Sequence, residues 1–126
     1  MIHGGDIGDR AILDALGTIA PVTAVRGNND LVEWGHLATD AVLRFEEVLV
    51  YAVHDAKELH ARRLPPGVRV VVSGHSHRPS VTEHGGVLYV NPGSAGPRRF
   101  RLPVTAAELV VDRGLATARG IELIPA

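Results

Sequence analysis

Residues 68–77, Val-Arg-Val-Val-Val-Ser-Gly-His-Ser-His, decide how the fold of this chain is interpreted. The β-branched run from Val68 to Val72 is typical of a strand that is buried on both faces of a sheet. His75 and His77 follow directly after the point where this strand ends. Because ligands gather outside the carboxyl ends of strands in open α/β sheets, this stretch predicts a polar site at a sheet edge.

Shorter apolar segments lie on both sides of this strand. Helical spacing from Ile7 to Thr18 predicts a helix with Asp9 as its N-cap, and a second helix is expected from Ala56 to Arg63. Residues 1–6 are interpreted as the end of a strand, and further strands are expected at 22–25, 41–45, 48–53, 81–83, 87–90, 105–112 and 115–123. Helix and strand alternate early and strands dominate late, which predicts an α/β fold with a mixed sheet in a single domain, residues 1–126.

The composition excludes several classes of protein. Hydrophobic residues make up 45% of the chain and charged residues 21%, which excludes a disordered polyelectrolyte. No apolar run approaches the roughly 18 residues of a membrane span. Thirteen Lys and Arg against 14 Asp and Glu give a net charge of −1, which disfavours nucleic-acid binding. The absence of cysteine excludes disulfides and thiolate chemistry. No secretory signal is found in the sequence, so we expect a cytoplasmic protein.

Metal-ligating residue types recur where predicted strands end. The chain has seven histidines, and five polar residues each lie just past an apolar strand: Asp6, Asn28, His54, His75 and His77. Carboxylate, amide oxygen and neutral imidazole suit Mn, Fe, Zn, Ni or Co in a site without thiolates. The set predicts a divalent-cation site at one edge of the sheet.

Taken one at a time, these residues also have structural interpretations. Asp6 alone can be a turn or capping residue, and Asn28 alone is better explained by a left-handed turn conformation. A lone His54 is more often a satisfied, partly buried imidazole than a ligand. His3 lies near the predicted site and can support it or only pack there.

Several motifs, in order, resemble those of the calcineurin-like metallophosphoesterases, and in particular the small YfcE-type phosphodiesterases. They are Gly5-Asp6, Gly27-Asn28-Asn29-Asp30, His54 at a strand end, Gly74-His75-Ser76-His77 and Asn91-Pro92-Gly93-Ser94. The resemblance implies a four-layer α/β/β/α sandwich with mixed sheets and a dinuclear metal centre. It also implies that Asp6 bridges both ions. Asn28, His54 and His75 would complete one ion's shell, and His77 would bind the other ion.

The activity implied by this resemblance is hydrolysis of a small phosphodiester or phosphomonoester by metal-activated hydroxide. The catalytic residues expected from it are His77, Asp30 and Asn28. His77 would help to protonate the leaving alkoxide, and Asp30 would hold an imidazole or the bridging water.

The sequence departs from the family pattern in two places. The family begins with a strand carrying an Asp-x-His motif, which serves the ion bound by His77, and this sequence has no such motif. We therefore expect an N-terminally truncated domain in which one site is incomplete, although the full-length protein would hold two ions (Mn, or Ni, Fe, Zn, Co). Weak or absent phosphodiesterase activity is expected from this chain, and an exposed interior strand edge favours a homo-oligomer. The second departure is Asp55, where the family often has glycine.

A second class of function stays open at this point. A retromer subunit resembles the same family yet works mainly by binding proteins, because a fold alone does not determine chemistry. The alternative to an enzyme is therefore a non-catalytic protein-interaction module on the same fold.

Overall fold

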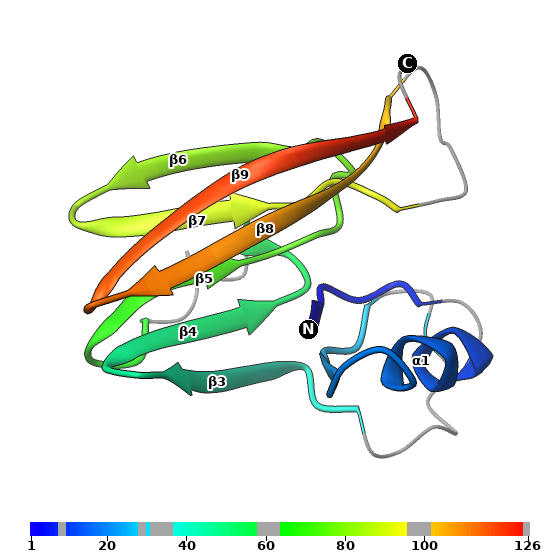
Figure 1. The fold of residues 1–126 in the computed structure, drawn as a ribbon, viewed down its shortest axis with the longest axis horizontal. Coiled ribbons are helices and arrows are strands. Elements are labelled where there is room, and N and C mark those ends of the chain that lie inside the picture. Colours follow the sequence, from blue (N-terminus) through cyan, green and yellow to red (C-terminus); the bar gives the residue numbers. More distant parts are fainter. Residues whose placement is uncertain (8–9, 28–29, 31–36, 58–63, 96–101, 125–126) are drawn as a thin grey trace.

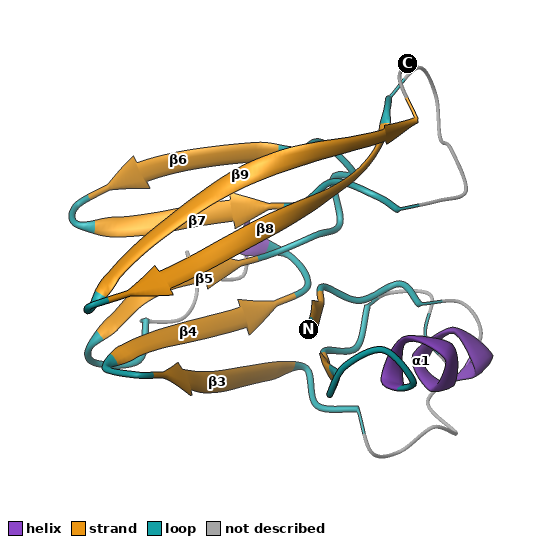
Figure 2. Ribbon diagram, viewed as in Figure 1, coloured by secondary structure: helices purple, strands orange, loops and turns teal. Residues whose placement is uncertain are grey.

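The computed structural model describes residues 1–7, 10–27, 30, 37–57, 64–95 and 102–124. Within these ranges the chain forms the helix α1 (Arg10–Gly17) and three sheets, so strands dominate the molecule (Figures 1 and 2). The α/β class with mixed sheets is confirmed. The chain order, with α1 near the start and long strands at the end, also follows the prediction.

The largest sheet has five strands in the order β3-β4-β5-β7-β6. These strands are β3 (Asp40–Phe45), β4 (Val48–Val53), β5 (Val68–Val72), β6 (Ser80–His84) and β7 (Val87–Asn91). The central strands β4, β5 and β7 are parallel, whereas β3 and β6 pair antiparallel at the two edges. Because the central strands are parallel, their carboxyl ends lie along the same side of the sheet, the side nearest α1 in Figure 1. We call this row of strand ends the carboxyl edge.

A long antiparallel ribbon, β8 (Val104–Asp112) and β9 (Leu115–Ile124), lies across one face of this sheet (Figure 1). The buried side chains at this interface are Val48, Val50, Val70, Val72 and Val90, and the ribbon packs against them with Ala107, Leu109, Val111, Ala116 and Ala118. Each fully buried valine contributes about 1.5–3 kcal/mol relative to an exposed one. The sheet and the ribbon are the two facing β layers of the sandwich.

The opposite face of the sheet carries a second apolar cluster, made by Tyr51, Val53, Val68 and Val71. Strand β5 therefore contributes to the core on both faces, as its valine run predicts. Arg69 is the exposed exception within the strand.

The first part of the chain forms a small parallel pair, β1 (Ile2–His3) and β2 (Thr23–Ala24), connected through α1. The periodicity predicted that the helix begins at Ile7, but it begins at Arg10. The backbone N–H of Ile7 donates to the Asp30 carboxylate over 2.7 Å, which holds this buried residue in the loop before the helix. Asp9, its predicted N-cap, and residues 58–63 of the second expected helix lie outside the described residues.

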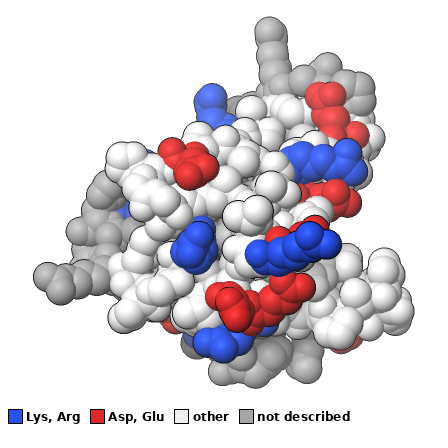
Figure 3. Space-filling model, turned by 60° about the vertical axis from the view of Figure 1, so that its left-hand side comes forward, with Lys and Arg blue, Asp and Glu red and all other residues white. Residues whose placement is uncertain are grey.

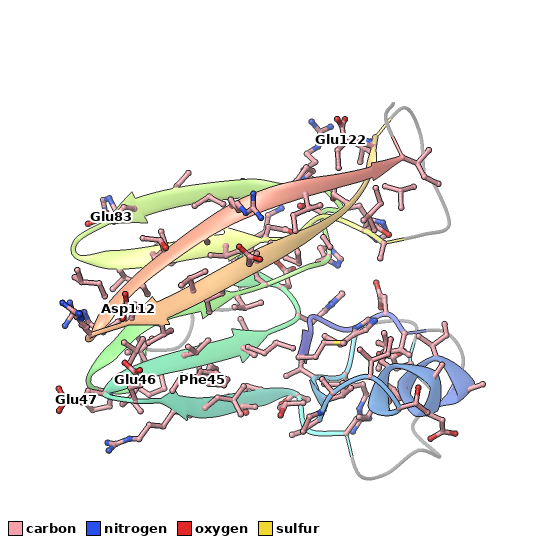
Figure 4. All side chains as sticks on the ribbon, viewed as in Figure 1. Phe45, Glu46, Glu47, Glu83, Asp112 and Glu122 are labelled. Atoms are coloured by element: carbon pink, nitrogen blue, oxygen red, sulfur yellow. The ribbon has the colours of Figure 1, made fainter. Side chains whose placement is uncertain are left out.

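Acidic and basic side chains alternate over the face shown in Figure 3, and neither sign forms a continuous patch there. Glu46, Glu47, Glu83 and Asp112 gather at the hairpin-turn end of the sheets, away from α1 (Figure 4). Among the described residues, no helix has the length and apolar character to cross a membrane.

Candidate metal centre

Three side chains with metal-binding atoms meet at the carboxyl edge of the sheet. Asp6 lies in the loop after β1, His54 follows β4 directly, and His75 lies in the loop after β5. His54 Nε2 is 3.2 Å from Asp6 Oδ2 and 3.2 Å from His75 Nδ1. One donor atom from each residue lies within 4.8 Å of the others. The structure thus brings together three of the five residues predicted to bind metal.

The spacing and the chemistry of these donors fit a divalent cation. An ion about 2.1 Å from each donor would space neighbouring donors about 3.0–3.4 Å apart, from octahedral to tetrahedral geometry. Both measured separations from His54 Nε2 fall in this range. One carboxylate and two imidazoles form a set that suits first-row divalent metals. The side chain of His75 is 41% exposed and that of His54 only 5%, so the cluster opens to solvent on the His75 side.

The backbone orients the ring of His54. Its Nδ1 lies 2.7 Å from the carbonyl oxygen of Gly4. Because a carbonyl oxygen can only accept, Nδ1 carries the hydrogen and donates it, which leaves the lone pair of Nε2 directed toward Asp6 and His75. A backbone carbonyl on the second ring nitrogen is a common support for a metal-binding histidine.

Asp30 holds the loop that carries Asp6. Its buried carboxylate accepts backbone N–H groups from Asp6 over 3.0 Å, Ile7 over 2.7 Å and Gly27 over 2.8 Å. These contacts show that the carboxylate supports the backbone of the loop, and its predicted contact to an imidazole or to the bridging water stays a prediction. The loop needs such support because Asp6 has a positive φ of 56°, which is uncommon for a residue other than glycine.

Glycines allow the Asp6 loop and the neighbouring segments to approach closely. A Cβ atom on Gly27 would collide with the backbone nitrogen and the Oδ1 of Asp6. A Cβ atom on Gly5, whose φ is 99°, would lie 2.6 Å from His54 Nδ1. The glycines of both motifs therefore leave the space in which Asp6 and His54 meet.

The loop after β5 is held by Asn91, the last residue of β7. The Asn91 amide nitrogen donates to Gly74 O over 3.0 Å and to Ser76 Oγ over 3.1 Å, and its Oδ1 accepts the Gly93 N–H over 2.9 Å. His75 and His77 have positive φ values of 67° and 61°. The Asn91 amide thus supports a strained loop. The sequence did not reveal this role, because it depends on β5 and β7 being neighbours.

The two remaining residues predicted to bind metal are His77 and Asn28. His77 is half-buried, two residues beyond His75, and among the described residues it is not part of the three-residue donor cluster. Asn28 lies outside the described residues. The roles of both as ligands and catalytic residues stay predictions.

His3 lies beside the cluster, where its Nδ1 accepts the N–H of Gly5 over 3.1 Å. Burial lowers the pKa of this imidazole below its usual 6.5, and nearby His54 lowers it further. The carboxylates of Asp30 and Asp6 oppose this shift. His3 therefore favours the neutral state that accepts the Gly5 hydrogen bond and supports the Gly5-Asp6 turn.

Comparison with known sequences gives a family. Residues 1–114 match the calcineurin-like phosphoesterase superfamily domain. A probable metallophosphoesterase of Methanocaldococcus jannaschii is 33% identical over 102 residues, which are 75% of this chain and 52% of that protein. One from Methanothermobacter thermautotrophicus is 32% identical over 110 residues, 82% of this chain and 64% of that protein. The chain therefore spans between about half and two thirds of the length of these relatives.

Comparison with solved structures gives the fold. Vps29 from Chaetomium thermophilum superimposes with a TM-score of 0.76 at 21% identity, over 98% of this chain and 80% of that one. The phosphoesterase YfcE from E. coli superimposes with a TM-score of 0.64 at 24% identity, over 84% of this chain and 70% of that one. Together with the match over residues 1–114, the fold and the donor cluster lead to one conclusion: this chain belongs to the calcineurin-like phosphoesterase superfamily.

Proposed function

We propose that this chain contributes the metal centre of a phosphoesterase that hydrolyses a small phosphodiester or phosphomonoester. The observation that carries the proposal is the convergence of Asp6, His54 and His75 at the carboxyl edge of the sheet, with donor separations of 3.2 Å. One carboxylate and two imidazoles form a donor set that suits a divalent cation. Membership in the superfamily supports the class of reaction.

A divalent cation at this cluster supplies activation of a water molecule and neutralisation of charge on the phosphoryl oxygens. The chain's own residues prepare the site for it. Gly4 holds the His54 ring, and Asp30 holds the Asp6 loop. The exposed side of His75 leaves an approach for a substrate.

Two further residues belong to this proposal. Asn28 would add an amide oxygen to the ion held by His54 and His75. His77, together with Asp6, would serve a second ion, and it would protonate the leaving alkoxide. The donor chemistry suits Mn²⁺, Ni²⁺, Fe²⁺, Zn²⁺ and Co²⁺. Because the second ion would have only two protein ligands in this chain, we expect slow turnover.

The test is hydrolysis of bis-p-nitrophenyl phosphate by the purified chain, with and without added Mn²⁺. The proposal predicts a slow rate that depends on Mn²⁺ and that disappears in Asp6→Asn. Asp112→Asn makes the same chemical change at the far end of the sheets and should keep the rate (Figure 4). A rate that is absent in every metal, or equal in Asp6→Asn, contradicts the proposal.

A non-catalytic protein-interaction module is the second candidate. The observation that favours it is structural similarity: the chain superimposes on Vps29 with a higher TM-score than on the phosphoesterase YfcE. A fold can serve either role, so the site must decide. Binding of a cation at Asp6, His54 and His75 without any turnover of phosphate esters would favour the interaction module.

A further inference from the structure

We propose that Asp55 is a positioning residue that orients His75 for metal binding; the inference rests on the metal centre proposed above. Asp55 follows His54 directly at the carboxyl end of β4. Its Oδ2 lies 3.8 Å from His75 Nε2.

The two nitrogens of His75 face different partners. Nδ1 lies 3.2 Å from His54 Nε2, inside the donor cluster, and Nε2 faces Asp55 on the outer side. The nitrogens of an imidazole lie on different edges of the ring, so the cluster and the carboxylate do not compete for the same atom. Asp55 thus selects the form of His75 in which Nε2 carries the hydrogen and the Nδ1 lone pair faces the ion.

His75 needs external orientation more than His54 does. The His54 ring is buried and its Nδ1 is held at 2.7 Å by a backbone carbonyl. The His75 side chain is 41% exposed and projects from a residue with a φ of 67°. An exposed ring loses rotamer freedom when it binds a metal, and a carboxylate that already restrains it lowers this cost.

The Asp55 carboxylate is itself held in place. Its Oδ1 accepts the backbone N–H of Lys57 over 3.0 Å, while Oδ2 is the oxygen nearer His75. At 3.8 Å the Asp55–His75 pair is an electrostatic contact and not a direct hydrogen bond. A small rotation of the exposed ring, or one bridging water, joins the two groups when His75 binds the ion.

Two substitutions separate orientation of His75 from the local turn. Asp55→Asn and Asp55→Ser both keep an oxygen that accepts the Lys57 N–H, but remove the negative charge facing His75. Asp112→Asn is the matched control, because it removes one negative charge from an exposed residue at the far end of the sheets (Figure 4). Thermal unfolding of all three variants checks that the fold is retained.

Two measurements test the proposal on the full chain. Calorimetric titration with Mn²⁺ should show a roughly tenfold weaker affinity in Asp55→Asn and Asp55→Ser, the size expected for loss of an outer partner of a ligand. In the chain loaded with diamagnetic Zn²⁺, ¹⁵N spectra of the His75 ring should show the ion on Nδ1 and hydrogen on Nε2, and occupancy of Nδ1 by the ion should decrease in both variants. Asp112→Asn should leave both the affinity and the ring spectrum unchanged.

The outcomes separate this inference from the proposed function. If the unaltered chain binds no ion, the proposed metal centre is contradicted and the role of Asp55 falls with it. If the unaltered chain binds Mn²⁺ but the Asp55 variants bind it as tightly as Asp112→Asn does, Asp55 has no positioning role while the metal centre stands. An unchanged His75 ring spectrum in the Asp55 variants also overturns the inference.

Discussion

His54 is the residue on which the candidate site is built. Its ring joins the Gly4 carbonyl on one side to Asp6 and His75 on the other, and it is almost fully buried. His54→Ala should therefore lower the Mn²⁺ affinity by about 100-fold or more, a larger loss than that of an outer partner. His84→Ala removes an exposed histidine from the end of β6 and should leave the affinity unchanged. Titration calorimetry checks both, and equal affinities would remove His54 from the site.

His3 predicts a pH dependence of stability in the metal-free chain. Folding lowers the pKa of His3 below 6.5, so the unfolded chain takes up a proton at a pH where the folded chain does not. The stability from His3 is therefore fully present above 6.5 and is lost as the pH falls through the lower folded pKa. Asn keeps an acceptor at the position of Nδ1 but cannot take up the proton. Urea unfolding of His3→Asn should lose less stability between pH 7 and pH 5 than the unaltered chain does; identical slopes would contradict this account.

Sequence reasoning identified the residues of the donor cluster better than the residues that support them. Asp6, His54 and His75 were predicted from their places after apolar strands, because parallel strands bring their carboxyl ends together. The supports depend on contacts across the fold that no local pattern reveals. From the sequence, Asn91 was identified only as the first residue of a family-like motif, and Asp55 only as a departure from the family pattern. The one local signal for Asp55 was an acidic residue directly beside a candidate ligand.

At the scale of elements, the Asp30 carboxylate links the loop after β1 to the loop after β2. Asp30→Ala leaves three backbone N–H groups without this acceptor, and each buried unsatisfied group costs about 1–3 kcal/mol. Relaxation of the two loops and entry of water would offset part of this free-energy cost. We therefore expect a loss of about 3 kcal/mol in the free energy of unfolding. Asp14→Ala, on the exposed side of α1, should change it by less than about 0.5 kcal/mol. Urea unfolding compares the two, and equal losses would refute the role of Asp30.

The elements themselves were predictable where the pattern is strong. β4 and β5 have the predicted bounds, and the hairpin strands extend by one or two residues beyond them, because pairing continues past the apolar residues. The periodicity placed the start of α1 at Ile7, but Ile7 is a buried residue of the preceding loop, and its backbone N–H donates to the Asp30 carboxylate. Periodicity alone cannot separate these two uses of an isoleucine.

The whole molecule depends on two β layers that share one apolar interface. Val70 is completely buried there, beneath the β8–β9 ribbon. Val70→Ala should lower the free energy of unfolding by about 2 kcal/mol, because neighbours on both layers limit how far the cavity can close. Val81→Ala, on the exposed edge strand β6, should cost less than about 0.5 kcal/mol. Denaturant unfolding measures both, and a similar small loss in each would contradict the two-layer core.

At this scale the mixed sheet was predictable, but the strand order was not. Alternation of helices and strands gave the class, whereas β5 pairs with β7 and not with β6, its neighbour in the chain. That crossover places the end of β7 beside the end of β5 and so brings Asn91 to the His75 loop. Strand order is determined by tertiary packing, so this part of the site required the structure.

The most direct test of the central claim is an anomalous difference map from crystals of the chain soaked in Mn²⁺, recorded near the manganese edge. The account predicts a peak bounded by Asp6 Oδ2, His54 Nε2 and His75 Nδ1, about 2.1–2.3 Å from each. No peak at these three atoms, in crystals where manganese binds elsewhere on the chain, would contradict the claim that they form a metal centre.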